Sequence, residues 1–451
     1  MPRLRVSILG FFLLLSHVAC GDVFNAGETV CFLGDSITHG GRFHSYVYDY
    51  YLTRFPDRTI RFVNAGVSGD SAGGALTRLD EDVIRHKPTS VVIMFGMNDV
   101  GRGSYVADPD AQKKAAQASA MERYKKNMGL LVARLGVDAG APRLLFVTPS
   151  PFDQTAVNDR GNNQPGCNDG LGLCAAFVRE LAGTQNGTVV DFHAPMTAFN
   201  LERQKSDPAY TIVGGDRVHP GAAGHLMMAW LFLKAQGAPA LVSRVAVDAA
   251  SGKAEEGVNA AVTGVVQAEG AWRFDVLEKA LPFPVDPAAR DILKQLPVER
   301  DLNQEIVAVR GLAAGAYELR IDGGAVGRYR AEELAEGVNV AFNEAAPQVK
   351  QAQKVAALNE ARRSAETVLR DYAAVRWFLK NRGVNPDDAS AVTLFAETKM
   401  NKSGYYEGKV PDYLKNWPAR DVVCAKVAEL ERQARAASTP APHVYEVRPV
   451  R

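Results

Sequence analysis

The fold of this chain is decided by the stretch Val30-Cys31-Phe32-Leu33-Gly34-Asp35-Ser36-Ile37-Thr38. Its first part is an apolar run with strand-forming residues, and it ends abruptly in Gly-Asp-Ser. This pattern is typical of a buried parallel strand that delivers a hydroxyl group to the carboxyl edge of a sheet. In open α/β sheets ligands bind at that edge. A lone Gly-Asp-Ser is weak evidence, because turns use the same residues widely.

The alternation of strand-like and helical runs over residues 23–237 supports a parallel sheet. Strands are expected over residues 29–33, 60–64, 90–95, 144–148 and 188–192, and helices near residues 43–55, 76–86, 118–135, 173–181 and 222–235. Five strands with helical crossovers predict an α/β fold with a doubly wound, five-stranded parallel sheet. The segment 162–172 is rich in Gly, Asn and Asp, and we expect it to form a loop.

The texture of the sequence changes after residue 240. Residues 241–345 contain short alternating runs separated by glycine turns, which predicts a small β-rich module. Residues 346–451 have helical spacing over 347–383 and 420–437, which predicts a helical C-terminal region, and residues 441–451 fit a returning strand. The α/β domain is therefore expected to span residues 24–240.

The N-terminus has the pattern of a secretory signal peptide. Arg3 and Arg5 precede an apolar core over residues 8–15, and small residues lead to Cys20. We therefore expect residues 1–20 to be a signal peptide and the protein to be exported to the periplasm, the cell surface or the medium. Cys20 is either a lipid-bearing cysteine or part of a plain cleavage region, since His17 stands where lipoprotein signals usually carry Leu.

Composition excludes several classes of partner. The chain has 451 residues with 52 basic and 51 acidic side chains, so no charge excess indicates a nucleic-acid partner. Five cysteines are too few for a disulfide scaffold, and Cys167 and Cys174 are either bridged or free. No glycine-rich phosphate-binding motif follows the first strand, and the eight histidines are too scattered to indicate a metal site.

Three consecutive strands each end in a polar or glycine-rich cluster, so the clusters are expected at one edge of the sheet. Ser36 follows the first strand, Gly69 the second and Asn98 the third. Acyl transfer needs a hydroxyl nucleophile and donors aimed at the oxyanion of a tetrahedral intermediate. Ser36 offers the hydroxyl and its backbone N–H, Gly69 a backbone N–H, and Asn98 a side-chain amide.

A serine nucleophile also needs a base, and the stretch before the last helix of the α/β domain offers one. Asp216 stands three residues before His219, and Pro220 suits the first turn of the helix that follows. The carboxylate is expected to hold the imidazole through its Nδ1–H, which leaves Nε2 free to take the serine proton.

In these motifs the chain resembles the SGNH hydrolases, also called GDSL esterases and lipases. The four blocks of that family carry Ser, Gly, Asn and His, which match Ser36, Gly69, Asn98 and His219, and the family's aspartate matches Asp216. The resemblance covers about residues 25–237. It implies a flavodoxin-like sheet, a Ser36–His219–Asp216 triad, an oxyanion hole formed by Ser36, Gly69 and Asn98, and no metal or other cofactor.

Neighbouring polar residues have several interpretations. Asp35 is expected to fix the turn at Ser36 by local hydrogen bonds, and Asp99 to be structural or to lie at the rim of the site. His39 and His44 follow Ser36 closely and either line the pocket or lie at the surface. Of the four tyrosines at positions 46, 48, 50 and 51, most are expected in the core.

The sequence therefore predicts an exported serine esterase that acts on short-chain, chiefly O-acetyl, esters. Carbohydrate is the expected substrate class by analogy with exported family members that carry extra β modules. One alternative is an acylhydrolase of the lipase or thioesterase type. The other is a protein that binds a glycan or an envelope component and has only secondary catalysis. The oligomeric state and the role of residues 241–451 are left open.

Overall fold

A computed structural model describes residues 23–255, 257–398 and 404–450. The expected signal peptide and Cys20 lie outside these residues. Among the helices that are described, none has the length and apolarity needed to cross a membrane.

The N-terminal half is built on one five-stranded parallel sheet, as predicted. Its strands are β1 (Thr29–Gly34), β2 (Arg61–Gly66), β3 (Ser90–Met94), β4 (Arg143–Val147) and β5 (Thr188–Val190). They lie in the order β2-β1-β3-β4-β5, and each pair is parallel. This is the flavodoxin-like order, in which the chain reverses its direction of winding between β1 and β3. The carboxyl ends of these two strands are therefore the expected place for a site.

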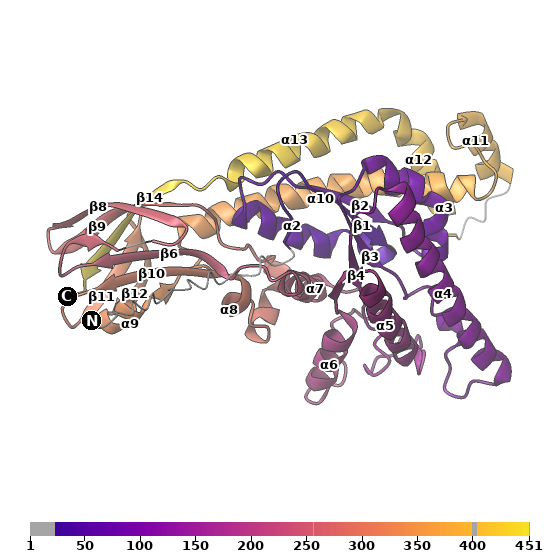
Figure 1. Ribbon diagram of the computed structural model, residues 1–451, viewed down its shortest axis with the longest axis horizontal. Coiled ribbons are helices and arrows are strands. Elements are labelled where there is room, and N and C mark those ends of the chain that lie inside the picture. Colours follow the sequence, from indigo (N-terminus) through magenta and orange to yellow (C-terminus); the bar gives the residue numbers. More distant parts are fainter. Residues whose placement is uncertain (1–22, 256, 399–403, 451) are drawn as a thin grey trace, which may run out of the picture.

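The side-chain alternation of β1 explains why helices cover both faces of the sheet. Val30 and Phe32 point to one apolar cluster, whereas Cys31 and Leu33 point to the other. The first cluster contains residues of α2 (Arg42–Arg54) and α7 (Ala222–Ala235). The second contains residues of α3 (Ala72–Asp82), α4 (Ala111–Asp138) and α5 (Cys167–Thr184). Figure 1 shows the strands between these helices.

The expected loop over residues 162–172 is wrong in its second half, because α5 begins at Cys167. Cys167, Leu171, Cys174 and Val178 recur at helical spacing and are fully or almost fully buried against the sheet. Burial of this apolar stripe stabilises a helix even though the first turns also contain Gly, Asn and Asp residues, which disfavour one. The short helix α6 (His193–Gln204) was not predicted either.

Two further sheets form a sandwich at one end of the molecule (Figure 1). The first sheet contains β13 (Val338–Asn339), β10 (Gln304–Arg310), β6 (Leu241–Asp248) and β7 (Lys253–Ala254). The second contains β12 (Gly324–Arg330), β11 (Ala316–Ile321), β14 (Pro442–Pro449), β9 (Ala271–Glu278) and β8 (Ala260–Ala268). Apolar residues of both sheets, such as Val245, Val307, Phe274 and Leu319, form one shared core.

Short helical segments complete the sandwich and its junction with the parallel sheet. They are the 3-10 helix η3 (Pro287–Lys294), α8 (Val298–Leu302) and α9 (Ala331–Glu336). Ile292, Val298 and Leu302 pack into the same apolar cluster as α2 and α7. The two halves of the chain therefore share part of one hydrophobic core.

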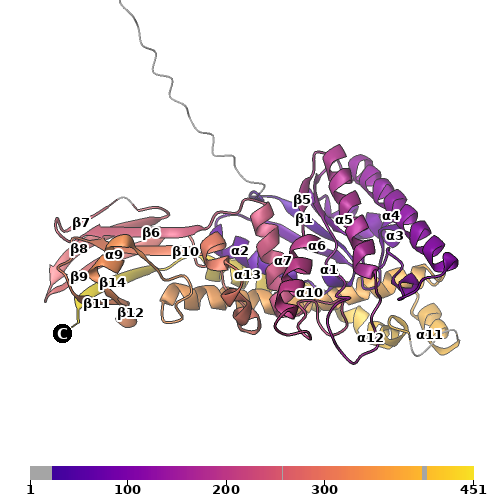
Figure 2. The ribbon, with the colours of Figure 1, turned by 90° about the horizontal axis from the view of Figure 1, so that it is seen from below.

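Two long helices connect the sandwich to the carboxyl edge of the parallel sheet. Helix α10 (Pro347–Lys380) packs against α2, and α13 (Arg420–Ser438) lies along α10 in both views (Figures 1 and 2). Between them α11 (Ala389–Thr398) and α12 (Val410–Asn416) pack on the far end of α10. After α13 the chain enters the sandwich as β14, between β9 and β11. The C-terminal strand thus lies in the middle of the second sheet.

Candidate active site

Ser36, His219 and Asp216 lie in hydrogen-bonding contact, although 183 positions of sequence separate the serine from the histidine. Ser36 is the first residue of the one-turn helix α1 (Ser36–His39), directly after β1. Its Oγ lies 2.7 Å from Nε2 of His219, and Nδ1 of His219 lies 2.6 Å from Oδ2 of Asp216. The structure thus brings together the three residues that the sequence analysis selected.

The Asp216 carboxylate also shapes the turn that carries the histidine. Its Oδ1 accepts hydrogen bonds from the backbone N–H groups of Val218 at 3.0 Å and His219 at 2.9 Å. Burial by itself raises the pKa of Asp216, but the hydrogen bonds from His219 and Val218 outweigh it and hold the pKa below its usual value. The carboxylate is therefore ionised at neutral pH and able to stabilise an imidazolium.

Asp35 fixes the turn at the serine, as expected. Its side chain caps α1 by accepting the backbone N–H of Ile37 at 3.0 Å. Burial raises the pKa of Asp35 to about 6. Because its carboxylate points to the backbone rather than to His219, Asp35 positions the serine and does not compete with the base.

Gly69 and Asn98 lie beside Ser36 at the same edge of the sheet. Gly69 has a φ of +76°, in the left-handed region that favours glycine, and its N–H donates no hydrogen bond to a described residue. Nδ2 of Asn98 donates to the carbonyl of Asp70 at 2.8 Å. One amide hydrogen is thereby fixed, and the second remains available for an oxyanion.

Asp99 holds together the two loops that carry these donors. Its Oδ1 accepts the N–H of Ala72 at 2.9 Å, and its Oδ2 accepts the N–H of Gly96 at 3.1 Å. Burial raises the pKa of Asp99 to about 7. The residue is structural, because both oxygens are used by the backbone of the loops after β2 and β3.

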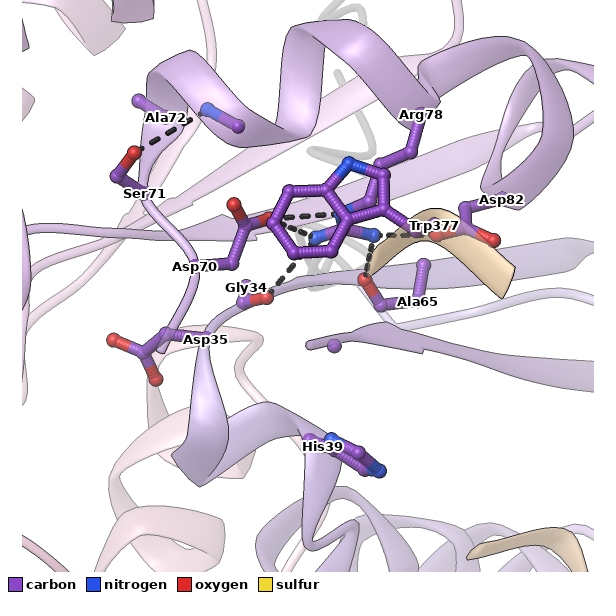
Figure 3. A network of polar contacts seen from close by, with 12 residues as sticks. Gly34, Asp35, His39, Ala65, Asp70, Ser71, Ala72, Arg78, Asp82 and Trp377 are labelled. Atoms are coloured by element: carbon purple, nitrogen blue, oxygen red, sulfur yellow. Dashed lines mark hydrogen bonds and ion pairs between the residues drawn. The ribbon is translucent and has the colours of Figure 1, made fainter. Parts of the chain in front are cut away.

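A buried charge network holds Asp70, the residue after Gly69, and Figure 3 shows Arg78 between Asp70 and Asp82. The Arg78 guanidinium lies 2.6 Å from Oδ2 of Asp70 and 2.7 Å from Oδ2 of Asp82. Arg370 of α10 reaches Asp82 Oδ2 at 2.5 Å and the carbonyl of Gly66 at 2.6 Å. Burial would raise the pKa of Asp82, but Arg370 and Arg78 hold it far below its usual value. Through Arg370, this network connects the loop that contains Gly69 and Asp70 to the C-terminal half.

A cleft of about 560 Å³ opens over these residues. One wall is formed by the sheet edge, with Ser36, Gly69, Asn98 and His219, and by Arg102. The other wall comes from the C-terminal half and contains Thr367, Asp371, Tyr405, Tyr406 and Lys409. A larger groove of about 820 Å³ lies between α4 and the start of α5, but none of the five predicted site residues lines it.

The C-terminal wall was missed by the sequence analysis. Tyr406 donates its hydroxyl to the carbonyl of Ser68 at 2.6 Å, next to Gly69. Lys409 Nζ lies 2.6 Å from Oδ1 of Asp371 on α10. A Tyr-Tyr pair at positions 405 and 406 was the only signal in the sequence, and it has no family motif around it.

The two histidines after Ser36 have different environments. His39 lines the cleft, accepts the N–H of Ser68 at Nδ1 over 3.1 Å, and places Nε2 3.2 Å from Oδ1 of Asp371. Gly66 permits this arrangement, because a Cβ there would lie 2.2 Å from the backbone nitrogen of His39. His44 is buried and stacks on Phe32, with ring centroids 4.7 Å apart. The four tyrosines of α2 are all buried.

The sequence left open whether Cys167 and Cys174 are bridged or free. Cys167 and Cys174 are free and buried. Within the described ranges, no group of three or more His, Cys, Asp or Glu side chains is placed to hold a metal ion.

The fold and this arrangement define the class of protein. The chain belongs to the GDSL-like lipase/acylhydrolase family, which its sequence matches over residues 32–227. It is therefore a carboxylic ester hydrolase.

Two individual proteins are similar to this chain. An acetylxylan esterase of Geobacillus stearothermophilus is 30% identical over 224 residues, which cover 46% of this chain and 94% of the relative. The solved structure of BT4096, described as a gut microbial diltiazem-metabolizing enzyme, is 30% identical and superposes with a TM-score of 0.87. That match covers 95% of this chain and 99% of the other, so it includes the sandwich and the long helices.

Proposed function

We propose that the protein is an exported serine esterase that hydrolyses short-chain, chiefly O-acetyl, esters carried by carbohydrate. The observation that carries the proposal is the contact of Ser36 Oγ with His219 Nε2 at 2.7 Å, with Asp216 behind the imidazole at 2.6 Å. A serine hydroxyl in this position transfers its proton to a neutral imidazole as it attacks an ester carbonyl.

The reaction divides into two displacements. Ser36 Oγ bonds to the carbonyl carbon, its proton moves to Nε2 of His219, and the carbonyl oxygen becomes an oxyanion. When the intermediate collapses, the ester C–O bond breaks and the leaving alcohol takes the proton from His219. A water molecule then repeats the sequence on the acyl-serine and releases the acid, with His219 acting again as base and then as acid.

The oxyanion is stabilised by three donors in this scheme. They are the backbone N–H groups of Ser36 and Gly69 and the second amide hydrogen of Asn98, whose first hydrogen is held by the carbonyl of Asp70. Donors that are already oriented need no reorganisation as charge develops, which is why such groups lower the barrier. No metal or other cofactor takes part.

An acetyl group on a glycan is the substrate class that the acetylxylan esterase relative and the cleft favour. The acetylxylan esterase named above acts, as its name says, on an acetylated polysaccharide. The walls of the cleft are mixed polar and aromatic, with Asn98, Arg102, Asp371 and Tyr405 among them. A long acyl chain would need a continuous apolar groove, at about 0.8 kcal/mol for each buried methylene.

The cell compartment is part of the proposal. Residues 1–20 support export, and Cys20 offers a lipid anchor if it is the processing site. Fractionation of cells that express the full chain and Cys20→Ala tests both statements. Recovery of the wild-type protein in the cytoplasmic fraction would contradict export. If Cys20→Ala and the wild type divide equally between the membrane and soluble fractions, the lipid anchor at Cys20 would be contradicted.

The test of the proposed activity is a series of 4-nitrophenyl esters together with acetate release from acetylated xylan. We expect kcat/KM to fall steeply from acetyl to butyryl and to be negligible for octanoyl, and we expect measurable acetate from the glycan. A kcat/KM that climbs with chain length would support the lipase alternative instead. Binding of the glycan without cleavage of any ester would support the binding-protein alternative.

A further inference from the structure

An exposed aromatic ring lies on the wall that the C-terminal half contributes to the cleft. Tyr405 is 58% exposed, although it lines the cleft beside the nucleophile. Its hydroxyl lies 3.5 Å from Oγ of Ser68, one residue before the oxyanion donor Gly69. The ring is therefore placed within reach of a substrate whose carbonyl is bound at Ser36.

The neighbours of Tyr405 hold its ring in place without covering it. Tyr406 packs edge-on, with ring centroids 5.0 Å apart and an interplanar angle of 82°. Nζ of Lys409 lies 4.9 Å from the centroid of the Tyr405 ring, which adds a cation–π contact. Tyr406 is itself anchored by its hydrogen bond to the Ser68 carbonyl. More than half of the surface of Tyr405 remains exposed to solvent, and the residue lines the cleft.

A carboxylate with a free oxygen lies on the same wall. Oδ1 of Asp371 is shared by Lys409 at 2.6 Å and by His39 Nε2 at 3.2 Å. Oδ2 accepts no hydrogen bond from the residues that the structure describes, and 29% of the side chain is exposed. Because Lys409 and His39 fix the carboxylate, Oδ2 is a pre-oriented acceptor for a hydroxyl group.

The size of the cleft leaves room for more than the acyl group. Its volume of about 560 Å³ lies within the range of sites that hold a whole small ligand, about 300–1,000 Å³. An acetyl group at Ser36 fills a small part of it. The alcohol portion of the ester must occupy the rest, against the C-terminal wall.

We propose that Tyr405 and Asp371 form a subsite for the sugar ring that bears the acetyl ester. The Tyr405 ring stacks on the apolar face of the sugar, and Oδ2 of Asp371 accepts a hydrogen bond from a ring hydroxyl. The inference rests on the proposed acetylesterase function and names the part of the molecule that selects its alcohol. The catalytic domain cleaves the ester, and the C-terminal half recognises the sugar.

The experiment compares two acetate esters that differ in the alcohol. One is an acetylated xylooligosaccharide, and the other is ethyl acetate, which has no ring to stack. We measure kcat/KM for both with the wild type, Tyr405→Ala, Tyr405→Phe and Asp371→Asn. Leu394→Ala is the control, because Leu394 is exposed on α11 and lies outside the cleft.

For Tyr405→Ala we expect kcat/KM for the sugar ester, divided by kcat/KM for ethyl acetate, to fall by about tenfold. The fall should come mainly from a higher KM for the sugar ester. A tenfold change corresponds to about 1.4 kcal/mol of lost stacking. Tyr405→Phe retains the ring and is expected to keep the ratio within about twofold of wild type. Asp371→Asn is expected to lower the ratio, since an amide is a weaker acceptor than a carboxylate. Leu394→Ala should leave both values unchanged.

Three results would contradict the inference, and they differ in which activities are lost. If the wild type releases acetate from the sugar ester but Tyr405→Ala leaves the ratio unchanged, the subsite is wrong and the esterase function stands. If the wild type cleaves ethyl acetate and not the sugar ester, the carbohydrate function itself is wrong. An equal loss of both activities in Tyr405→Ala would assign Tyr405 a structural role and also overturn the subsite.

Discussion

The side-chain amide of Asn98 carries two hydrogens, and we propose a different partner for each. One hydrogen of Nδ2 is held by the carbonyl of Asp70 at 2.8 Å, and the second hydrogen remains available in the cleft that Asn98 and Ser36 both line. Asp99 fixes the backbone on either side through Ala72 and Gly96. The donor is thus pre-oriented by its neighbours, which is the condition under which an oxyanion donor is most effective.

Asn98→Ala is therefore expected to lower kcat by about 10²–10³ with little change in KM, because the lost hydrogen bond strengthens mainly in the transition state. Steady-state kinetics on 4-nitrophenyl acetate measures the effect. Asn163→Ala is a matched control, since the Asn163 side chain lies in an exposed loop and hydrogen-bonds only to the backbone of that loop, at Gln154 and Gln164, among the described residues. A change confined to KM would make Asn98 a substrate-binding residue.

The residues proposed for the triad and the oxyanion hole could be selected from the sequence because each stands in a local pattern. Ser36, Gly69 and Asn98 directly follow apolar strands, and parallel strands place their carboxyl ends together. Tyr405 and Asp371 had no such pattern. Tyr405 reaches Ser68 across 337 positions of sequence, so the contact follows from tertiary packing and has no local pattern in the sequence.

Among the secondary-structure elements, the helices that could be predicted are those with a regular row of apolar residues along one face. Helix α6 was missed because only Met196 and Asn200 are buried, so its sequence has almost no apolar periodicity. The start of α5 was missed because Gly, Asn and Asp residues, of which Asn168 and Gly170 are themselves buried, interrupt the apolar residues of its first turns. The strands of the parallel sheet were found because they are buried on both faces.

The interface between the two sheets of the sandwich contains a buried pair of acids, Glu278 on β9 and Glu305 on β10. Ser243 donates to Oε1 of Glu278 at 2.5 Å, whereas neither oxygen of Glu305 has a hydrogen-bond partner among the described residues. Burial raises the pKa of both side chains, and their mutual repulsion raises that of Glu305 further. The folded sandwich therefore retains protons that the unfolded chain has lost.

This pair predicts that the free energy of unfolding falls as the pH rises. Its contribution is fully present below the ordinary glutamate pKa of 4.5 and is lost as the pH rises toward the raised pKa of the folded state. Glu305→Gln cannot ionise, so the fall between pH 5 and pH 8 should be smaller than in the wild type. Urea unfolding at both pH values measures the difference, with exposed Glu332→Gln as the control. An equal fall in wild type and Glu305→Gln would contradict the assignment.

At the scale of the whole molecule, the C-terminal half is interlocked with the catalytic domain. Helix α10 has 34 residues, which corresponds to about 51 Å at 1.5 Å per residue, and it connects the sandwich to the wall of the active-site cleft. Nδ2 of Asn359 on this helix donates to Ser45 and Asp49 of α2, all buried. The return through α13 to β14 closes the second sheet of the sandwich.

A chain that ends at residue 240 is therefore expected to be unstable, although the acetylxylan esterase relative matches only the N-terminal half. Truncation would leave the Arg54 guanidinium without Leu302 and Asp82 without Arg370, and it would expose the apolar face of α2. We expect the melting temperature to fall by more than about 10 °C, or the product to aggregate. Thermal unfolding followed by circular dichroism measures this, and an unchanged melting temperature would contradict it.

Ser36 is proposed to attack the ester carbonyl, and the kcat of purified Ser36→Ala on 4-nitrophenyl acetate and on acetylated xylan tests this role. The substitution removes one oxygen at a partly exposed position, so the circular dichroism spectrum and melting temperature should match those of the wild type. With Oγ absent, kcat is expected to fall by about 10⁶ on both substrates. A correctly folded Ser36→Ala protein that retains more than a few per cent of wild-type kcat would rule out Ser36 as the nucleophile.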